Sequence, residues 1–127
     1  MTSLTYDRVE QAMKDAVPEV ENNYPSLLSW YPHPDPYALF TFVLKPVLKP
    51  ALESDDSQVL TRVFRFFEEM ARSSDIQVPN LLQIQVFEWL VGEPGNLATA
   101  WKYMSEETKN VARRTARILH CEDNLPN

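Results

Sequence analysis

The hydrophobic positions between residues 57 and 72 repeat with the period of an α-helix. At about 100° per residue, the apolar side chains fill one continuous arc and the charged side chains fill the opposite arc. The apolar arc consists of Val59, Leu60, Val63, Phe64, Phe66, Phe67, Met70 and Ala71, and the polar arc of Arg62, Arg65, Glu68, Glu69 and Arg72. Asp55, Asp56 or Ser57 can cap the unpaired amides of the first turn. The pattern predicts an amphipathic helix whose two glutamates face solvent.

A second helix is predicted over residues 79–91, after the connector SSDIQVPN. Pro79 suits its first turn, where a missing amide costs little, and Gly92 suits its C-terminal end. Apolar residues cover most of its circumference and leave Gln85 and Glu88, three residues apart, as one narrow polar strip. The two helices together predict an antiparallel hairpin, the unit from which HEAT-like layers are built.

Weaker helical patterns flank this central hairpin, which spans residues 57–91. Helical periodicity is present over residues 5–16 and continues beyond Pro18, whereas alternate prolines make WYPHPDPY an extended loop. The following segment, ALFTFVLKPVLKPAL, is predicted to be a helix that kinks or breaks near Leu44, because prolines interrupt it. The conformation of the proline-rich residues 32–50 does not follow from the pattern.

Two further helices are predicted after the glycine-containing turn GEPGN. The first docks through Leu97, Ala98, Ala100, Trp101 and Met104. The second is capped by Ser105 and turns inward Val111, Ala112, Thr115, Ile118 and Leu119. Its outer face holds Lys109, Arg113, Arg114 and Arg117. These cations can meet a phosphate, but cations near a helix C-terminus are also favoured by the helix dipole, so we interpret them as a solvated face.

The composition agrees with one globular domain. The chain has 127 residues, of which 44% are hydrophobic and 24% charged, enough for a core and a solvated exterior. We therefore predict an all-α single domain over residues 1–127, with about five to seven helices and a flexible tail at 121–127. No apolar run approaches the ~20 residues of a membrane span, and MTSLTYDRVEQ lacks the features of a secretory signal, so we expect a cytoplasmic protein. The single cysteine, Cys121, excludes an internal disulfide.

The charge balance indicates the chemistry of the partner. The chain has 12 Lys and Arg against 18 Asp and Glu, a formal net charge of −6. This sign is wrong for binding nucleic acid or an anionic membrane. The natural complement is a protein with a basic surface.

Catalytic patterns are not found in the sequence. The only histidines, His33 and His120, have no recognisable partner for a nucleophile–base pair. With glycine only at positions 92 and 95, no GxSxG, GxxxxGK[ST] or GxGxxG motif can exist. The metal-binding spacings Glu-x-x-His and His-Glu-x-x-His are missing as well. We therefore predict a protein that is not an enzyme and that has no catalytic residue, metal site or cofactor.

Glu88 is the carboxylate that calls for an explanation, because it lies on a helix that is apolar nearly all round. It can form an internal ion pair with Arg62 or Arg65, or it can emerge on an open face. In the second case Gln85, Glu88 and Trp89 form a strip that suits a basic partner surface. We take this strip as the candidate partner-binding site, together with the carboxylates Asp55, Asp56, Asp75 and Glu93.

The order of motifs resembles that of a family of small all-helical bacterial proteins. The resemblance covers most of the chain and rests on a VPE turn at 17–19, an F-x-x-E-x-M/L-type helix at 67–70, an SxD connector at 73–75 and an E-x-L triplet at 88–90. Members of this family are often encoded beside polymorphic or contact-dependent toxins and are regarded as immunity proteins. The resemblance implies that the chain neutralises a cognate toxin by occluding its active site or an essential surface. The alternative is a helical adaptor or scaffold without inhibitory activity.

Overall fold

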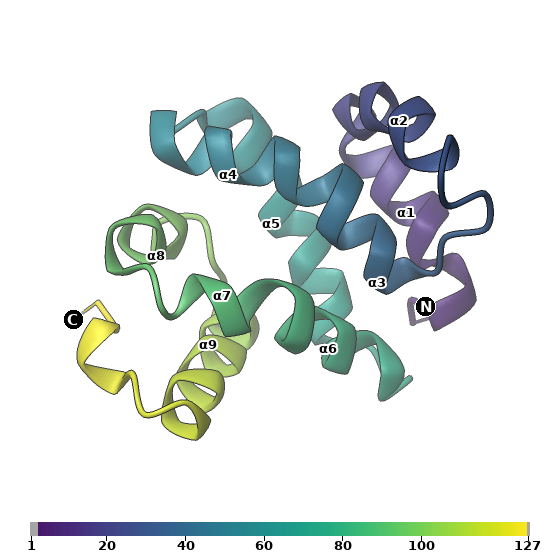
Figure 1. Cartoon of the computed structure of the whole chain (residues 1–127). Coiled ribbons are helices and arrows are strands. Elements are labelled where there is room, and N and C mark those ends of the chain that lie inside the picture. The colour runs from purple at the N-terminus through teal and green to yellow at the C-terminus, as the bar shows by residue number, and fades with distance from the viewer. Residues whose placement is uncertain (1–2, 127) are drawn as a thin grey trace.

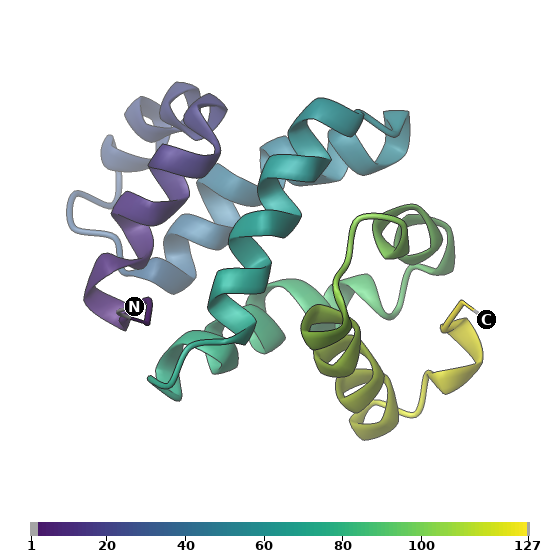
Figure 2. The same ribbon diagram turned by 180° about the vertical axis from the view of Figure 1, so that it is seen from behind.

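The structure is a computed structural model that describes residues 3–126, and all regular structure in this part of the chain is helical. Seven continuous helical segments follow one another, as Figure 1 and Figure 2 show from opposite sides. Their buried hydrophobic side chains form one cluster. The prediction of an all-α single domain of about five to seven helices is confirmed. Stacking of the helix pairs in the manner of HEAT repeats stays a prediction.

The seven segments combine α-helices with short 3-10 or π turns. The first four are η1 (Tyr6–Arg8) with α1 (Val9–Ala16), η2 (Pro18–Asn23) with α2 (Tyr24–Leu28), α3 (Pro36–Leu39) with η3 (Phe40–Leu44) and α4 (Lys45–Ser54), and α5 (Ser57–Ala71). The last three are α6 (Gln77–Leu82) with η4 (Gln83–Phe87) and α7 (Glu88–Leu90), then α8 (Pro94–Trp101), and α9 (Glu106–Ile118), which the 3-10 turn η5 (Glu122–Asn124) follows. Among these turns, η3 and η4 are π-helical.

Helix α5 forms the centre of the molecule. It contacts α1, α4, α6 and α9, and Figure 2 shows it crossing the middle of the fold between α1 and α9. Its buried face matches the predicted arc, because Leu60, Val63, Phe64, Phe66, Phe67 and Met70 are all buried. The rings of Phe64 and Phe67 meet edge to face, with their centroids 5.2 Å apart. Such a side chain contributes about 1.5–3 kcal/mol when it is fully buried, so α5 supplies a large part of the core energy.

The sharp corner between α4 and α5 depends on two consecutive aspartates. Asp55 ends α4 in the left-handed region, at φ 51°. Asp56 caps α5 and accepts a hydrogen bond from the Val59 amide at 3.3 Å, which settles the choice among the three predicted caps. The corner folds α5 back onto α4, and the two helices pack against each other.

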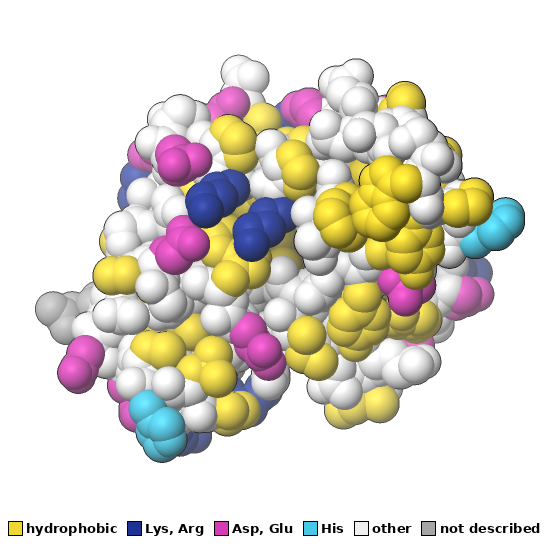
Figure 3. All heavy atoms as spheres, in the orientation of Figure 1, with side chains coloured by type: hydrophobic (Ala, Val, Ile, Leu, Met, Phe, Trp, Pro, Cys, Tyr) yellow, Lys and Arg dark blue, Asp and Glu magenta, His cyan; other side chains and the backbone are white. Residues whose placement is uncertain are grey.

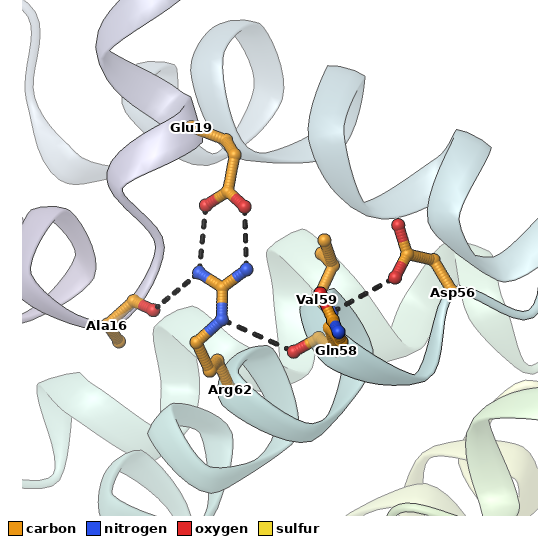
Figure 4. Close-up of polar contacts among 6 residues, drawn as sticks. All are labelled: Ala16, Glu19, Asp56, Gln58, Val59 and Arg62. Atoms are coloured by element: carbon orange, nitrogen blue, oxygen red, sulfur yellow. Dashed lines mark hydrogen bonds and ion pairs between the residues drawn. The ribbon is translucent and has the colours of Figure 1, made fainter.

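An ion pair joins the N-terminal segments to α5. Arg62 donates two hydrogen bonds to the Glu19 carboxylate, at 2.9 Å from Nη1 and 2.6 Å from Nη2. Figure 4 shows this two-pronged contact and a further bond from Nη1 to the Ala16 carbonyl at 3.3 Å. The Nε of Arg62 also donates to the Gln58 carbonyl. Because a planar guanidinium matches both carboxylate oxygens, the contact fixes the turn after α1 against α5.

The helix that contains α3 and α4 does not break at its prolines. It runs without interruption from residue 36 to residue 54, and the π turn η3 lies just before Pro46. The Lys45 amide donates to the Phe40 carbonyl, five residues earlier. We attribute the absence of a break to this wider turn, because Pro46 has no amide to donate and its ring would crowd a regular α-helix. The proline-rich loop itself ends at Asp35, which caps α3 through the Ala38 amide at 2.9 Å.

The last long helix, α9, differs from the prediction in two ways. Ser105 stands at the cap position but makes no bond to a backbone amide, and its hydroxyl lies 3.3 Å from that of Thr108. Ile118 and Leu119 are exposed instead of buried. The buried stripe consists of Thr108, Val111, Ala112, Thr115 and Ala116. Val111, Ala112 and Thr115 are therefore buried as predicted, whereas Thr108 and Ala116 had not been assigned to the stripe.

Part of the tail at 121–127 contacts the rest of the chain, and its flexibility stays a prediction. Asn124 in η5 donates from Nδ2 to the Val91 carbonyl at 2.9 Å, and Leu125 packs against the core. His120, at φ 58°, turns the chain back after α9. Residue 127 lies outside the described residues.

Candidate functional site

The predicted strip of Gln85, Glu88 and Trp89 lies together on η4 and α7. Glu88 is exposed and has no ion-pair partner within 4.0 Å among residues 3–126. The predicted ion pair with an arginine is wrong, because Arg62 is engaged by Glu19. Arg65 is exposed and forms no ion pair in this part of the chain. Glu88 therefore emerges on an open face, as the second alternative predicted.

Gln85 joins two π turns that face each other. The turns η3 and η4 are in contact, and the Gln85 side chain donates from Nε2 to the Tyr37 carbonyl at 2.5 Å and to the Thr41 hydroxyl at 2.8 Å. π-Helical turns are rare in proteins and occur frequently at functional sites. The predicted contact residue Gln85 thus has an internal role, which is to hold the two turns together.

Trp89 is held from two sides. Its indole Nε1 donates to the Gln85 carbonyl at 3.0 Å, four residues earlier in the same helical segment. The Lys45 ammonium, from the start of α4, lies 4.8 Å from the ring centroid. Trp89 is half-buried, so the ring contributes to the packing between the two helical segments and also to the surface. A cation above the face of an indole ring is attracted to the ring, so this contact holds Lys45 next to the strip.

An exposed aromatic pair lies on the same side of the molecule. Trp30, from the loop after α2, is 58% exposed, and Phe42, from η3, is 43% exposed. Their ring centroids are 5.1 Å apart and their planes nearly perpendicular, at 88°. The two rings border a cleft of about 140 Å³ that Leu27, Asn23 and Ser26 also line. The lining of this cleft combines aromatic and aliphatic side chains with the polar side chains of Asn23 and Ser26.

Sequence reasoning missed this pair. Phe42 was counted among the apolar residues of a helix, and because it stands three residues after the buried Leu39, the α-helical phase gave no signal that it would be exposed. Trp30 had no such signal either, because a loop without periodicity carries it. Ile84, on η4, is likewise 44% exposed beside Gln85.

We call the surface formed by Trp30, Phe42, Ile84, Gln85, Glu88 and Trp89 the π face. Its two parts are linked through η3, because Gln85 bonds to Thr41 while the next residue, Phe42, contacts Trp30. Figure 3 views this side of the molecule and shows hydrophobic side chains gathered between α2 and α3 and again over α6, with charged side chains between and beside them. The face is therefore a mixture of aromatic or aliphatic anchors and charge on two helical segments.

The other predicted carboxylates are not gathered at the π face, and each has bonds within the chain. The Lys102 ammonium and the Tyr103 hydroxyl both donate to Asp55, and these two hydrogen bonds lower the pKa of the Asp55 carboxyl. Asp56 caps α5. Asp75 accepts from the amides of residues 6 and 77, at 2.9 and 3.2 Å. Glu93 accepts from Asn96 at 2.6 Å and lies 3.8 Å from the Lys49 ammonium. Their bonds give these four residues a role in holding the fold.

The glutamates of α5 differ from each other. Glu69 is exposed, as predicted. Glu68 is half-buried between α5 and α9, where it accepts a hydrogen bond from the Thr108 hydroxyl at 3.1 Å and another from Arg72. Thr108 is fully buried, so Glu68, together with the Ser105 hydroxyl, satisfies a polar group of the core. The prediction that Glu68 faces solvent is therefore wrong.

Other hollows on the surface are open grooves. One, of about 420 Å³, lies between α1 and α5 and is lined by Ala12, Asp15, Ala16, Arg62, Arg65, Phe66 and Glu69. Another, of about 410 Å³, is bordered by Tyr24, whose hydroxyl donates to Glu10 at 2.9 Å. Burial raises the pKa of Tyr24, and the Glu10 carboxylate raises it further. In the described part of the chain, no group of three or more His, Cys, Asp or Glu side chains is placed to hold a metal ion. Over the same residues, every helix is too short or too polar to cross a membrane.

Comparison with known proteins gives a family without an assigned activity. A family model for DUF7674, a domain of unknown function, matches residues 10–120. No curated protein and no solved structure matches the chain.

Proposed function

The chain belongs to the DUF7674 family, a domain of unknown function, and we propose from its site that it binds and neutralises a partner protein through the π face, as an immunity protein does with a toxin. The proposed action is occlusion of the toxin's active site or of an essential surface, in the cytoplasm of the producing cell. The resemblance of the motif order to immunity proteins supports this choice of partner.

The observation that carries the proposal is the exposed Trp30–Phe42 pair on η3 and the loop after α2, together with the exposed Glu88, which has no ion pair among residues 3–126. Aromatic side chains on rigid elements, surrounded by polar groups, are the residues that dominate the energy of protein–protein interfaces. Their T-shaped contact and the bonds of Gln85 hold this surface in place before a partner arrives. Pre-organised anchors lose little conformational entropy on binding, which favours a tight complex.

The charge of the chain favours a basic partner. A net charge of −6 attracts a cationic surface over several ångströms and speeds association. Glu88 is exposed and unpaired in the described chain, so an incoming cation displaces no internal partner. A toxin that cleaves nucleic acid needs such a cationic surface, which the π face would cover.

A helical adaptor would use the same face without inhibiting its partner. The two functions differ in what happens to the partner's activity once the complex has formed. The proposal expects the neighbouring gene to encode a toxin domain, and co-expression with that domain separates the two functions, because an adaptor would leave the toxin lethal.

The test compares three forms of the protein in cells that express that toxin domain. We expect the wild type to restore growth and to co-elute with the toxin in gel filtration. The double variant Trp30→Ser/Phe42→Ser should lose both effects. The control Ile76→Ser changes an exposed isoleucine at the start of α6, outside the π face, and should protect fully. Continued lethality with the wild type, or full protection by the double variant, would overturn the proposal.

A further inference from the structure

Helix α9 presents a second exposed surface with different chemistry. Arg114, Arg117 and Ile118 are spaced i, i+3 and i+4, so they lie on the same side of the helix. All three are exposed, and Ile118 is 55% exposed. Leu119 follows directly and is also exposed. The outer side of α9 therefore combines cations with aliphatic side chains.

The cations on α9 are arranged in two ways. Lys109 and Arg113 both lie against the ring of Trp101, 5.4 and 5.5 Å from its centroid, and Arg113 also pairs with Glu106 at 3.3 Å. Arg114 and Arg117 form no ion pair within residues 3–126. The first pair is fixed by its contacts within the chain, and the second pair is available to another molecule. We call Lys109, Arg113, Arg114, Arg117, Ile118 and Leu119 the α9 outer face.

A solvated helix end explains only part of this surface. The helix dipole favours cations in the last turn, which accounts for Arg117. It does not account for Ile118, which is exposed on the same side as the arginines, or for the exposed Leu119 that follows it at the end of the helix. Apolar side chains gathered at one place and bordered by charge are typical of an interaction site.

We propose that the α9 outer face docks an acidic, amphipathic segment of a partner protein. Carboxylates of that segment pair with Arg114 and Arg117, and its apolar side chains cover Ile118 and Leu119. The argument is charge complementarity, because Arg114 and Arg117 have neither an ion pair nor an aromatic partner among residues 3–126 and they share one side of α9 with the exposed Ile118.

A membrane or a nucleic acid fits this surface less well. Either would place a large anionic surface against a chain of net charge −6, which repels it at longer range. Glu106 and Glu107, in the first turn of α9, add to that repulsion. A peptide segment contacts the α9 outer face alone. Phosphate groups would also leave Ile118 and Leu119 uncovered.

This site is separate from the π face. Figure 2 shows α9 on the near side of the molecule, while the segment that carries α3 and α4 lies at the back. The proposal for the α9 outer face does not depend on the proposed function. An experiment can refute either proposal without affecting the other.

Fluorescence anisotropy with defined probes tests the proposal. The main probe is a fluorescein-labelled helical peptide with Glu and Leu on one face, and its control has Lys in place of each Glu. The variant Arg114→Glu/Arg117→Glu is matched by Arg8→Glu/Arg65→Glu, which changes the net charge equally at two exposed arginines elsewhere. Ile118→Ser tests the apolar part. Phosphatidylserine vesicles and a DNA duplex serve as alternative ligands.

We expect the Glu–Leu peptide to bind saturably and the Lys–Leu peptide not to bind. Arg114→Glu/Arg117→Glu should weaken binding about tenfold or more, whereas the matched control changes it by about twofold at most. Ile118→Ser should weaken binding without changing its salt dependence. Absence of saturable peptide binding, an equal loss in both double variants, or tighter binding of the vesicles or the DNA would overturn the proposal.

Discussion

The substitution Glu19→Gln isolates the charge of the Glu19–Arg62 contact, because it preserves the shape of the side chain. The hydrogen bonds from Arg62 lower the pKa of Glu19 from 4.5 to about 2. Without screening, this shift would correspond to about 3 kcal/mol in the free energy of unfolding. The two side chains are 36% and 38% exposed, so screening by solvent reduces the contribution to about 1 kcal/mol. For a domain of this size, the melting temperature should fall by about 3–5 °C at neutral pH.

The same contact predicts how the effect of the variant depends on pH. A carboxylate with a lowered pKa in the folded state stabilises the protein above its unfolded pKa. That contribution is lost as the pH falls through the folded pKa. The stability difference between wild type and Glu19→Gln should therefore be full above pH 4.5 and should decline between pH 4.5 and pH 2.

The stability difference between wild type and Glu19→Gln can be measured by urea unfolding, followed by circular dichroism. The titrations run at pH 7 and at several lower values down to about pH 2.5, which approaches the folded pKa of about 2. Glu69→Gln is the matched control, since Glu69 is an exposed glutamate of α5 without an ion pair in the described chain. Its stability should equal that of the wild type at each pH. The reasoning would be refuted if Glu19→Gln were as stable as the wild type at pH 7, or if its deficit did not change with pH.

Three further changes test the core, the link between the π turns and the end of α9. Phe67→Ala empties a fully buried position in α5 and should lower the free energy of unfolding by about 4 kcal/mol in urea titrations. Gln85→Ala removes the bonds to Tyr37 and Thr41, so it should lower that free energy by about 1–2 kcal/mol and speed amide exchange in η4. His120→Gly relieves a side chain at φ 58° and should raise the melting temperature by about 2–4 °C, whereas His120→Ala, which keeps the β-carbon, should not.

The parts of the fold that could be predicted are those that local periodicity controls. In α5, six large apolar residues and the charged residues opposite them leave one phase for the helix, and the buried face follows that phase. In α9, the stripe that is buried contains threonines and alanines, which a hydrophobicity pattern does not distinguish from surface residues. Ile118 and Leu119 were assigned to the core because they continue the phase of the buried Val111 and Ala112, but they are the last residue of α9 and the residue after it, and both are exposed.

The candidate site also contains residues that could be predicted from local periodicity and residues that could not. Gln85, Glu88 and Trp89 could be grouped from spacing alone, because positions i, i+3 and i+4 share one side of a helix. The contact between Trp30 and Phe42 depends on the path of a proline-rich loop, which has no period. The Glu19–Arg62 pair joins residues 43 apart in the chain, so the sequence offered no reason to prefer it over an arginine pair with Glu88. The π turns had no recognisable signature either.

The structure also changes which residue of the predicted strip can contact a partner. Gln85 uses its amide on Tyr37 and Thr41, and Trp89 uses its indole NH on the Gln85 carbonyl, so neither donor is free for another molecule. Glu88 has no such bond in the described chain and is exposed. Substitutions at different positions of the strip should therefore affect the stability of the fold and the affinity for a partner differently. Gln85→Ala should weaken the fold more than the partner complex, whereas Glu88→Lys should leave the melting temperature nearly unchanged and weaken binding of a basic partner. An equal loss of stability in both variants would show that Glu88 also serves the fold.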